Sequence, residues 1–160
     1  MRRPALLFCP ALEGDVDLVK KLTVLLICLA LGTVAYAEEK NPVIPRVPPK
    51  ERGDAKALKN PVANTPENVA KGKAIYEGKG QCIHCHGASG KGDGPAGQVL
   101  NPSPRDFTNP KFHLNRTDGE MFWVLKNGIS GTGMVPLIGG PITEEEAWYV
   151  INYERSFEGK

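Results

Sequence analysis

The sequence contains few of the side chains that carry chemistry by themselves, because its 160 residues include only four cysteines and three histidines. It also lacks a block of basic residues: 20 Lys and Arg are nearly balanced by 18 Asp and Glu, for a formal net charge of +2. Proteins that bind nucleic acid usually gather positive charge on one surface, so this composition excludes DNA or RNA as the partner. No segment alternates apolar and polar residues over a useful length, which predicts helices and loops without a β-sheet.

Residues 1–37 are typical of an export signal. A pair of lysines precedes the apolar run 22–35, and an Ala-Tyr-Ala sequence ending at Ala37 places small residues where a signal peptidase reads them. We expect cleavage after Ala37 and a periplasmic mature chain. An uncleaved membrane anchor is the less favoured alternative, because the run is shorter than the roughly 20 residues of a spanning helix.

Residues 1–18 fit such a signal poorly. Glu13, Asp15 and Asp17 bring negative charge to a region that should be positive. We interpret this stretch as a spurious extension, with the true start near Val19.

Residues 38–65 are rich in proline and charge, which favours extended backbone over packed structure. We interpret them as a tail or linker; a strap that wraps the domain or contacts a partner is the second interpretation. The folded domain is then expected over 66–158.

Cysteine usage narrows the chemistry of that domain. Cys9 and Cys28 lie in the leader, so the mature chain keeps only Cys82 and Cys85 and has no thiol left for a structural disulfide. A lone Cys-x-x-Cys pair in an exported protein has three interpretations: covalent haem attachment, a thiol oxidoreductase site, or half of a zinc site.

The surroundings of the pair favour haem. A thioredoxin-like enzyme would flank it with strands, but the sequence before it is helical in pattern and the segment 87–95 after it is rich in glycine. Zinc would need two further ligands, and no second paired motif occurs. Because His86 follows Cys85 directly, the motif matches c-type haem attachment, in which two thiolates add to the vinyl groups and the histidine ligates iron.

Three segments carry helix start signals, each a threonine followed by acidic residues. The predicted helices are 66–77 after Thr65, a helix from Thr117 to Asn127, and a helix that begins at Thr143. About 95 residues with three short helices make a thin core, and a covalently held haem would supply the apolar body around which they close.

Several separated motifs occur in one order along the domain. They are Gly72-Lys-Ala-Ile-Tyr76, Cys82-Ile-His-Cys-His-Gly87, Gly90-Lys-Gly-Asp-Gly-Pro95, Gly131-Thr-Gly-Met134 and Glu146-Ala-Trp-Tyr-Val-Ile-Asn-Tyr153. Together they resemble class I monohaem cytochromes c, notably bacterial periplasmic cytochromes and the cytochrome domains of cbb3-type oxidases. The resemblance implies an all-α cytochrome c fold with one covalent haem c, in which the first and last helices cross at Gly72 and Tyr153.

The resemblance also implies a role for each matching site residue. Cys82 and Cys85 would hold the haem by thioether bonds, and His86 would be the proximal axial ligand of the iron. Met134, on a loop before the last helix, would be the distal ligand. Pro95 matches the proline whose backbone carbonyl accepts the other N–H of the histidine ring and so orients it.

Histidine and methionine together leave no open coordination position on iron, so we expect an electron carrier and not an enzyme. The carrier would be a monomer that shuttles single electrons between a protein donor and a protein acceptor in a periplasmic respiratory chain. Lys79, Lys91 and Lys111 are candidates for its docking rim, although each is individually explained as an ordinary solvated lysine.

Two other functions stay open at this point. The domain could be a haem subunit fixed in a membrane dehydrogenase or oxidase complex, with the proline-rich segment as its attachment. Alternatively, a five-coordinate haem could act as a gas sensor or peroxidase if Met134 does not ligate.

Overall fold

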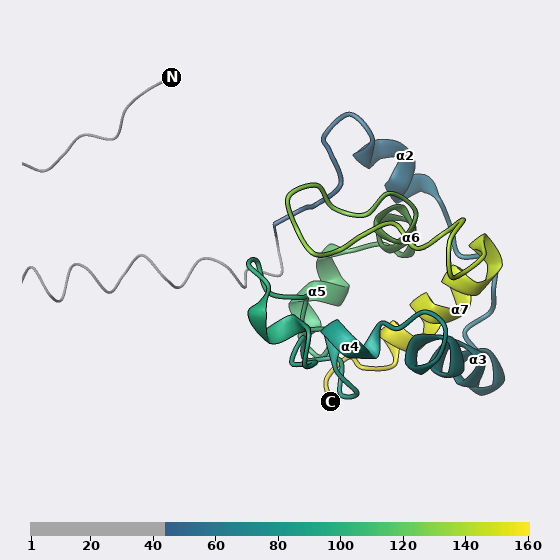
Figure 1. The fold of residues 1–160 in the computed structure, drawn as a ribbon. Coiled ribbons are helices and arrows are strands. Elements are labelled where there is room, and N and C mark those ends of the chain that lie inside the picture. Colours follow the sequence, from purple (N-terminus) through teal and green to yellow (C-terminus); the bar gives the residue numbers. More distant parts are fainter. Residues whose placement is uncertain (1–43) are drawn as a thin grey trace, which may run out of the picture. The chain divides into compact units, whose positions relative to one another are not determined.

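The computed structural model describes residues 44–160, so the expected signal 1–37, its extension 1–18 and the first residues of the proline-rich segment lie outside the described residues. Seven helical elements follow one another (Figure 1): α2 (Arg52–Ala57), α3 (Pro66–Glu77), α4 (Ile83–His86), the 3-10 helix η2 (Gly97–Val99), α5 (Pro110–Asn115), α6 (Asp118–Asn127) and α7 (Glu144–Arg155). No strand forms within this part of the chain, where a single isolated bridge pairs Ile138 with Ile142. The predicted all-α fold is therefore confirmed.

The three helices predicted from their capping residues form where expected. The Thr65 side chain accepts the Asn68 N–H at 3.3 Å and starts α3. Thr117 and Thr143 each form a complete capping box at the starts of α6 and α7. These caps satisfy backbone donors that have no partner inside the helix, which is why the helix starts are readable from sequence.

The first long helix, α3, packs against the last, α7 (Figure 1). A Cβ atom on Gly72 would lie 1.9 Å from the carbonyl oxygen of Tyr149, so glycine is required for the two backbones to approach this closely. Beside this crossing, the Tyr76 and Tyr153 rings meet edge to face with centroids 5.1 Å apart. The crossing implied by the resemblance is confirmed.

Residues 44–60, called the strap below, pack against the domain and differ from a free linker. Val47 is only 2% exposed, and the α2 carbonyl of Ala55 would lie 2.0 Å from a Cβ on Gly119 at the start of α6. The Trp123 indole N–H donates to Glu51 at 2.9 Å. Composition predicted a linker because proline and charge dominate it, but the buried side chains of Val47 and Ala55, together with the bond between Trp123 and Glu51, hold the backbone against the domain.

The shorter elements α2, α4, α5 and η2 were not predicted from the sequence, although α5 starts with a capping Asn109 followed by Pro110. None of the helices in the described part of the chain is long and apolar enough to cross a bilayer.

Candidate haem-binding site

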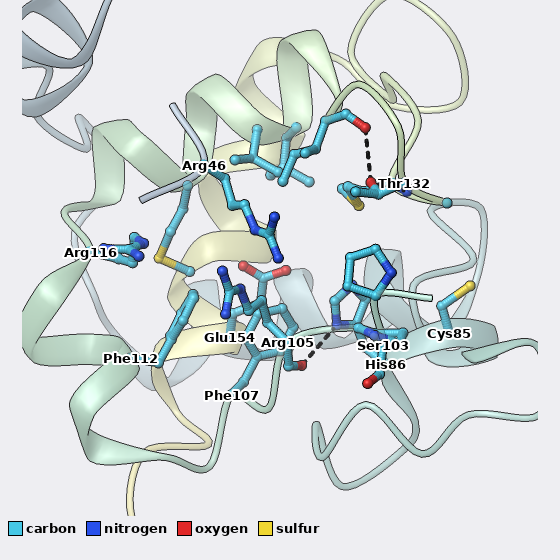
Figure 2. A pocket seen from close by; sticks show the side chains of 18 of the residues that line it. Arg46, Cys85, His86, Ser103, Arg105, Phe107, Phe112, Arg116, Thr132 and Glu154 are labelled. Atoms are coloured by element: carbon cyan, nitrogen blue, oxygen red, sulfur yellow. Dashed lines mark hydrogen bonds between the residues drawn. The ribbon is translucent and has the colours of Figure 1, made fainter. Parts of the chain in front are cut away.

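A cavity with an empty volume of about 900 Å³, which includes its opening to solvent, lies among α4, α6, the loop 100–107 and the loop 129–134. Its wall is largely apolar, with side chains that include Leu100, Phe107, Phe112, Met121 and Leu125. A cavity of this character suits a large, mostly apolar ligand whose orientation is set by a few polar groups. Figure 2 shows the polar side chains around this space, among them Arg46, Arg105 and Glu154.

Both cysteines of the motif are free thiols: Cys82 is the N-cap residue of α4 and Cys85 lies in its single turn. Cys85 lines the cavity, whereas Cys82 is 8% exposed at the start of the helix. Burial raises the pKa of the Cys82 thiol to about 12. A thiol oxidoreductase needs the opposite shift, because the thiolate is its nucleophile, so the electrostatics of α4 oppose that alternative.

His86 is presented to the cavity in the neutral form that metal binding requires. Its Nδ1 lies 3.2 Å from the Arg105 carbonyl oxygen, and because a carbonyl only accepts, the proton is on Nδ1 and Nε2 keeps its lone pair. Burial lowers the pKa of the ring to about 4. The ring also stacks on Phe107 with centroids 4.5 Å apart, which fixes its plane.

The carbonyl that orients His86 is not the one expected from the sequence. Pro95 is exposed, on a loop that folds back against the outside of α4 through the hydrogen bonds from Gly94 N–H to Cys85 O at 3.2 Å and from Ala96 N–H to His84 O at 2.9 Å. Arg105 O lies beside the ring instead. Proline spacing alone could not distinguish the two loops, because the choice depends on how 87–97 and 102–107 pack around the helix.

Met134 lines the same cavity from the loop 129–134. Thr132, two residues earlier, lies across the cavity from His86 (Figure 2). Its hydroxyl accepts the Met134 N–H at 3.1 Å, and the Met134 carbonyl accepts the Ile129 N–H at 2.8 Å, so the loop is held by its own bonds. The structure thus brings both sequence-predicted axial ligands to one space. Met121 on α6 lines it too, as a second thioether.

Three arginines of the cavity wall were not identified from the sequence. Arg46 comes from the strap, Arg105 from the loop 100–107 and Arg116 from the residue before the α6 cap. Arg105 and Arg116 both donate to the Ile44 carbonyl, which joins the strap to the wall. Burial, then the like charges of Arg46 and Arg116, lowers the pKa of Arg105 to about 10. Gathered positive charge of this kind suits an anionic group on the ligand, such as a haem propionate.

Two buried carboxyl groups also line the cavity. Glu120 completes the α6 capping box by accepting the Thr117 N–H at 3.0 Å, while its Oε1 has no hydrogen-bond partner. Glu154 on α7 is 5% exposed, and burial raises its pKa to about 8. A single glutamate inside an amphipathic helix pattern gave no signal from which sequence reasoning could have found it.

The three lysines considered for docking differ in their surroundings. Lys79 forms an ion pair with Glu146 at 2.6 Å, whereas Lys91 and Lys111 are exposed. Lys79 therefore already has an acidic partner on its own chain.

The residues present fit a covalent haem. Two free thiols, a neutral imidazole, a thioether on a loop across the cavity, apolar walls and gathered arginines are the groups that such a cofactor requires. Within residues 44–160 there is no group of three or more His, Cys, Asp or Glu side chains arranged to hold a metal ion, so the zinc alternative gains no support.

The family model for cytochrome c matches residues 69–157, which is more than half of the chain. The chain therefore belongs to the cytochrome c family, whose members bind covalent haem c and transfer electrons.

A solved structure of a reducing HAO-like protein complex from Kuenenia stuttgartiensis contains a similar chain, with a TM-score of 0.54 and 31% identity. The match covers 61% of this chain and 47% of that chain, so this protein spans about half the length of its structural relative. No curated protein matches the sequence.

Proposed function

We propose that this protein is a periplasmic one-electron carrier in which Cys82 and Cys85 attach the haem and His86 and Met134 are its axial ligands. The observation that carries the proposal is that His86 and Met134, 48 positions apart in the sequence, line one cavity from two separate elements. A ligand pair of this kind leaves no open position for oxygen or peroxide, which favours a carrier over an enzyme or a gas sensor.

Bound haem supplies the iron that alternates between Fe(III) and Fe(II); the protein supplies its surroundings. Arg105 O holds the His86 ring in the tautomer whose Nε2 can ligate. The arginines balance anionic groups at the wall, and Phe107, Phe112 and Leu125 exclude water. An apolar, water-poor site with histidine and methionine ligands favours the reduced iron and raises the reduction potential.

Exchange of electrons with protein partners requires an accessible, apolar contact surface. Val99 is 85% exposed beside the cavity-lining Leu100, and Val135 is 57% exposed beside Met134. Apolar side chains at the centre of a small interface favour brief association, and the exposed Lys91 adds charge that acts mainly on the association rate. We infer that these residues belong to the surface that meets the donor and the acceptor.

The ligand assignment is tested by the absorption spectrum of the purified ferric protein. We expect the weak long-wavelength band of methionine-ligated haem, its loss in Met134→Ala, and carbon monoxide binding to the reduced variant but not to the reduced wild type at neutral pH. Met121→Ala is the matched control, because Met121 lines the same cavity and should leave the band in place. A band lost in Met121→Ala and kept in Met134→Ala would contradict the assignment.

The structural relative favours a second candidate function. Because that relative belongs to a protein complex, this domain is also a candidate haem subunit of a larger redox assembly. Gel filtration of native cell extract separates the two functions. A carrier should elute at the size of the monomer, whereas a subunit should elute with larger proteins and should stay with the membranes after a salt wash.

N-terminal sequencing of the exported protein tests the proposed cleavage after Ala37.

A further inference from the structure

One acidic side chain of the cavity has no part in the proposed attachment or ligation of the haem. The Glu154 carboxyl group points into the cavity (Figure 2), although the residue as a whole is only 5% exposed. Among residues 44–160 no hydrogen bond or ion pair reaches this carboxyl group. A group that is buried, ionisable and unpaired inside a redox site requires an explanation.

Burial without a partner disfavours the charged form of a carboxylic acid. Transfer of a carboxylate out of water is costly unless donors or a cation replace the water, so such a group keeps its proton. The raised pKa of Glu154, about 8, has this cause, and Arg155 beside it on α7 lowers the pKa only partly. Small changes of charge nearby can therefore change its protonation near neutral pH.

The basic groups around Glu154 have fixed charge over that range. They are Arg46 from the strap, Arg105 from the loop 100–107, Arg116 before α6 and Arg155 on α7 itself. Arginine stays protonated in this range, including Arg105 with its pKa of about 10.

Three further ionisable neighbours are either neutral or used in the proposed attachment and ligation of the haem. Tyr76 of α3 donates its hydroxyl proton to Gly87 O at 2.9 Å, and burial raises its pKa. The thiol of Cys82 forms part of the proposed thioether. His86 faces the same cavity as the proposed iron ligand, and among residues 44–160 Glu120 of α6 is the one other carboxyl group in the wall.

The charge that does change in this cavity is that of the iron. At an effective dielectric constant of about 20, removing one unit of positive charge about 10 Å away raises the proton affinity of a carboxyl group roughly tenfold. Glu154 lines the same cavity as His86, so it lies within the region where this change acts.

We propose that Glu154 is a redox-linked proton site, so that electron transfer by this domain is coupled to proton transfer. When a protein donor reduces the iron from Fe(III) to Fe(II), the Glu154 carboxylate takes one proton from solvent and becomes the carboxylic acid. Oxidation by the acceptor returns the proton to solvent, so one electron and one proton enter and leave together. The inference rests on the proposed function, because it requires the iron to occupy this cavity.

The first test is the midpoint potential of the haem-loaded protein between about pH 5 and about pH 9. In the wild type the potential should fall as pH rises; full coupling is a tenfold change in the reduction equilibrium for each pH unit, or about 59 mV for one electron. Glu154→Gln should flatten this slope, and Glu120→Gln, the matched change at the other buried carboxyl, should retain it. An unchanged slope in Glu154→Gln would overturn the proposal and assign the proton to another group, such as a propionate.

A second measurement observes the proton directly and does not depend on the variant loading haem. The infrared difference spectrum between reduced and oxidised wild-type protein should contain the carbonyl stretch of a protonated carboxylic acid, which grows on reduction and shifts in heavy water. A wild-type protein with no such band and a pH-independent potential would overturn the proton site. The proposed carrier function is tested by a different measurement, the absorption spectrum of Met134→Ala. A failure of the proton site can therefore be distinguished from a failure of the carrier function.

Discussion

The contact between α3 and α7 and the cavity beside it are built on opposite principles. The contact is closed and apolar: Gly72 removes even a methyl group, and Val150 and Ile151 of α7 are 0% exposed. The cavity uses the same helix α7, three residues beyond Ile151, to place Glu154 among arginines and apolar walls. The α3–α7 contact is formed by the chain alone. The cavity, in contrast, has polar groups that suit a bound cofactor.

The largest effect should come from removing the cofactor itself. In a Cys82→Ser, Cys85→Ser double variant the cavity loses its ligand, and the helices around it lose the apolar surface on which they close. We expect a poorly folded chain without a cooperative thermal transition, measured by calorimetry and by helical circular dichroism. A native-like, cooperative apoprotein would show that the α3–α7 contact supports the whole domain by itself.

The next largest effect should come from overpacking the contact between α3 and α7. Gly72→Ala forces a methyl group to within 1.9 Å of the Tyr149 carbonyl, and such overpacking should lower the free energy of unfolding by about 3 kcal/mol. Gly53→Ala is the matched control, because no atom lies within 4 Å of a Cβ there and α2 should gain up to about 1 kcal/mol from helix propensity. Denaturant unfolding of the haem-loaded proteins measures both, and equal effects would contradict the close approach.

The unpaired carboxyl group of the cavity should make stability depend on pH. In the folded chain burial raises the pKa of Glu154 to about 8 from an ordinary value of 4.5. Between these two pKa values the Glu154 carboxyl group is ionised in the unfolded chain and protonated in the folded chain. Its contribution to the free energy of unfolding is therefore complete below the unfolded pKa and is lost as the pH rises through the folded pKa. Each pH unit between the two pKa values should lower the free energy of unfolding by about 1.4 kcal/mol.

The measurement for this prediction is the difference in unfolding free energy between the wild type and Glu154→Gln, followed from acid to mildly alkaline pH. The comparison cancels titrations that both proteins share. A constant difference across that range would show that the pKa of Glu154 is the same in the folded and the unfolded chain, and would contradict the prediction.

The smallest effect should come from the strap. Val47→Ala removes two methyl groups from a side chain that is 2% exposed, which should cost about 2 kcal/mol of unfolding free energy. Val99→Ala, at a valine that is 85% exposed, should change it by less than about 0.5 kcal/mol. Equal values for the two would return the strap to the linker interpretation.

Local signals allowed much of the fold to be predicted. The three threonine caps located α3, α6 and α7, and the Cys-x-x-Cys-His motif located the centre of the site, because each acts within a few residues. The short elements α2 and α5 were missed, since helices of six residues are stabilised by packing more than by propensity.

Spacing inside one turn, and the order of the motifs along the chain, predicted which side chains would attach and ligate the haem. The packing of distant segments places the carbonyl of Arg105, and not that of Pro95, beside His86, and it brings Arg46 of the strap to the cavity. It also decided that Glu154 is buried without a partner. These outcomes depend on contacts between segments far apart in the chain, and burial and charge near a site are set by all of those segments together.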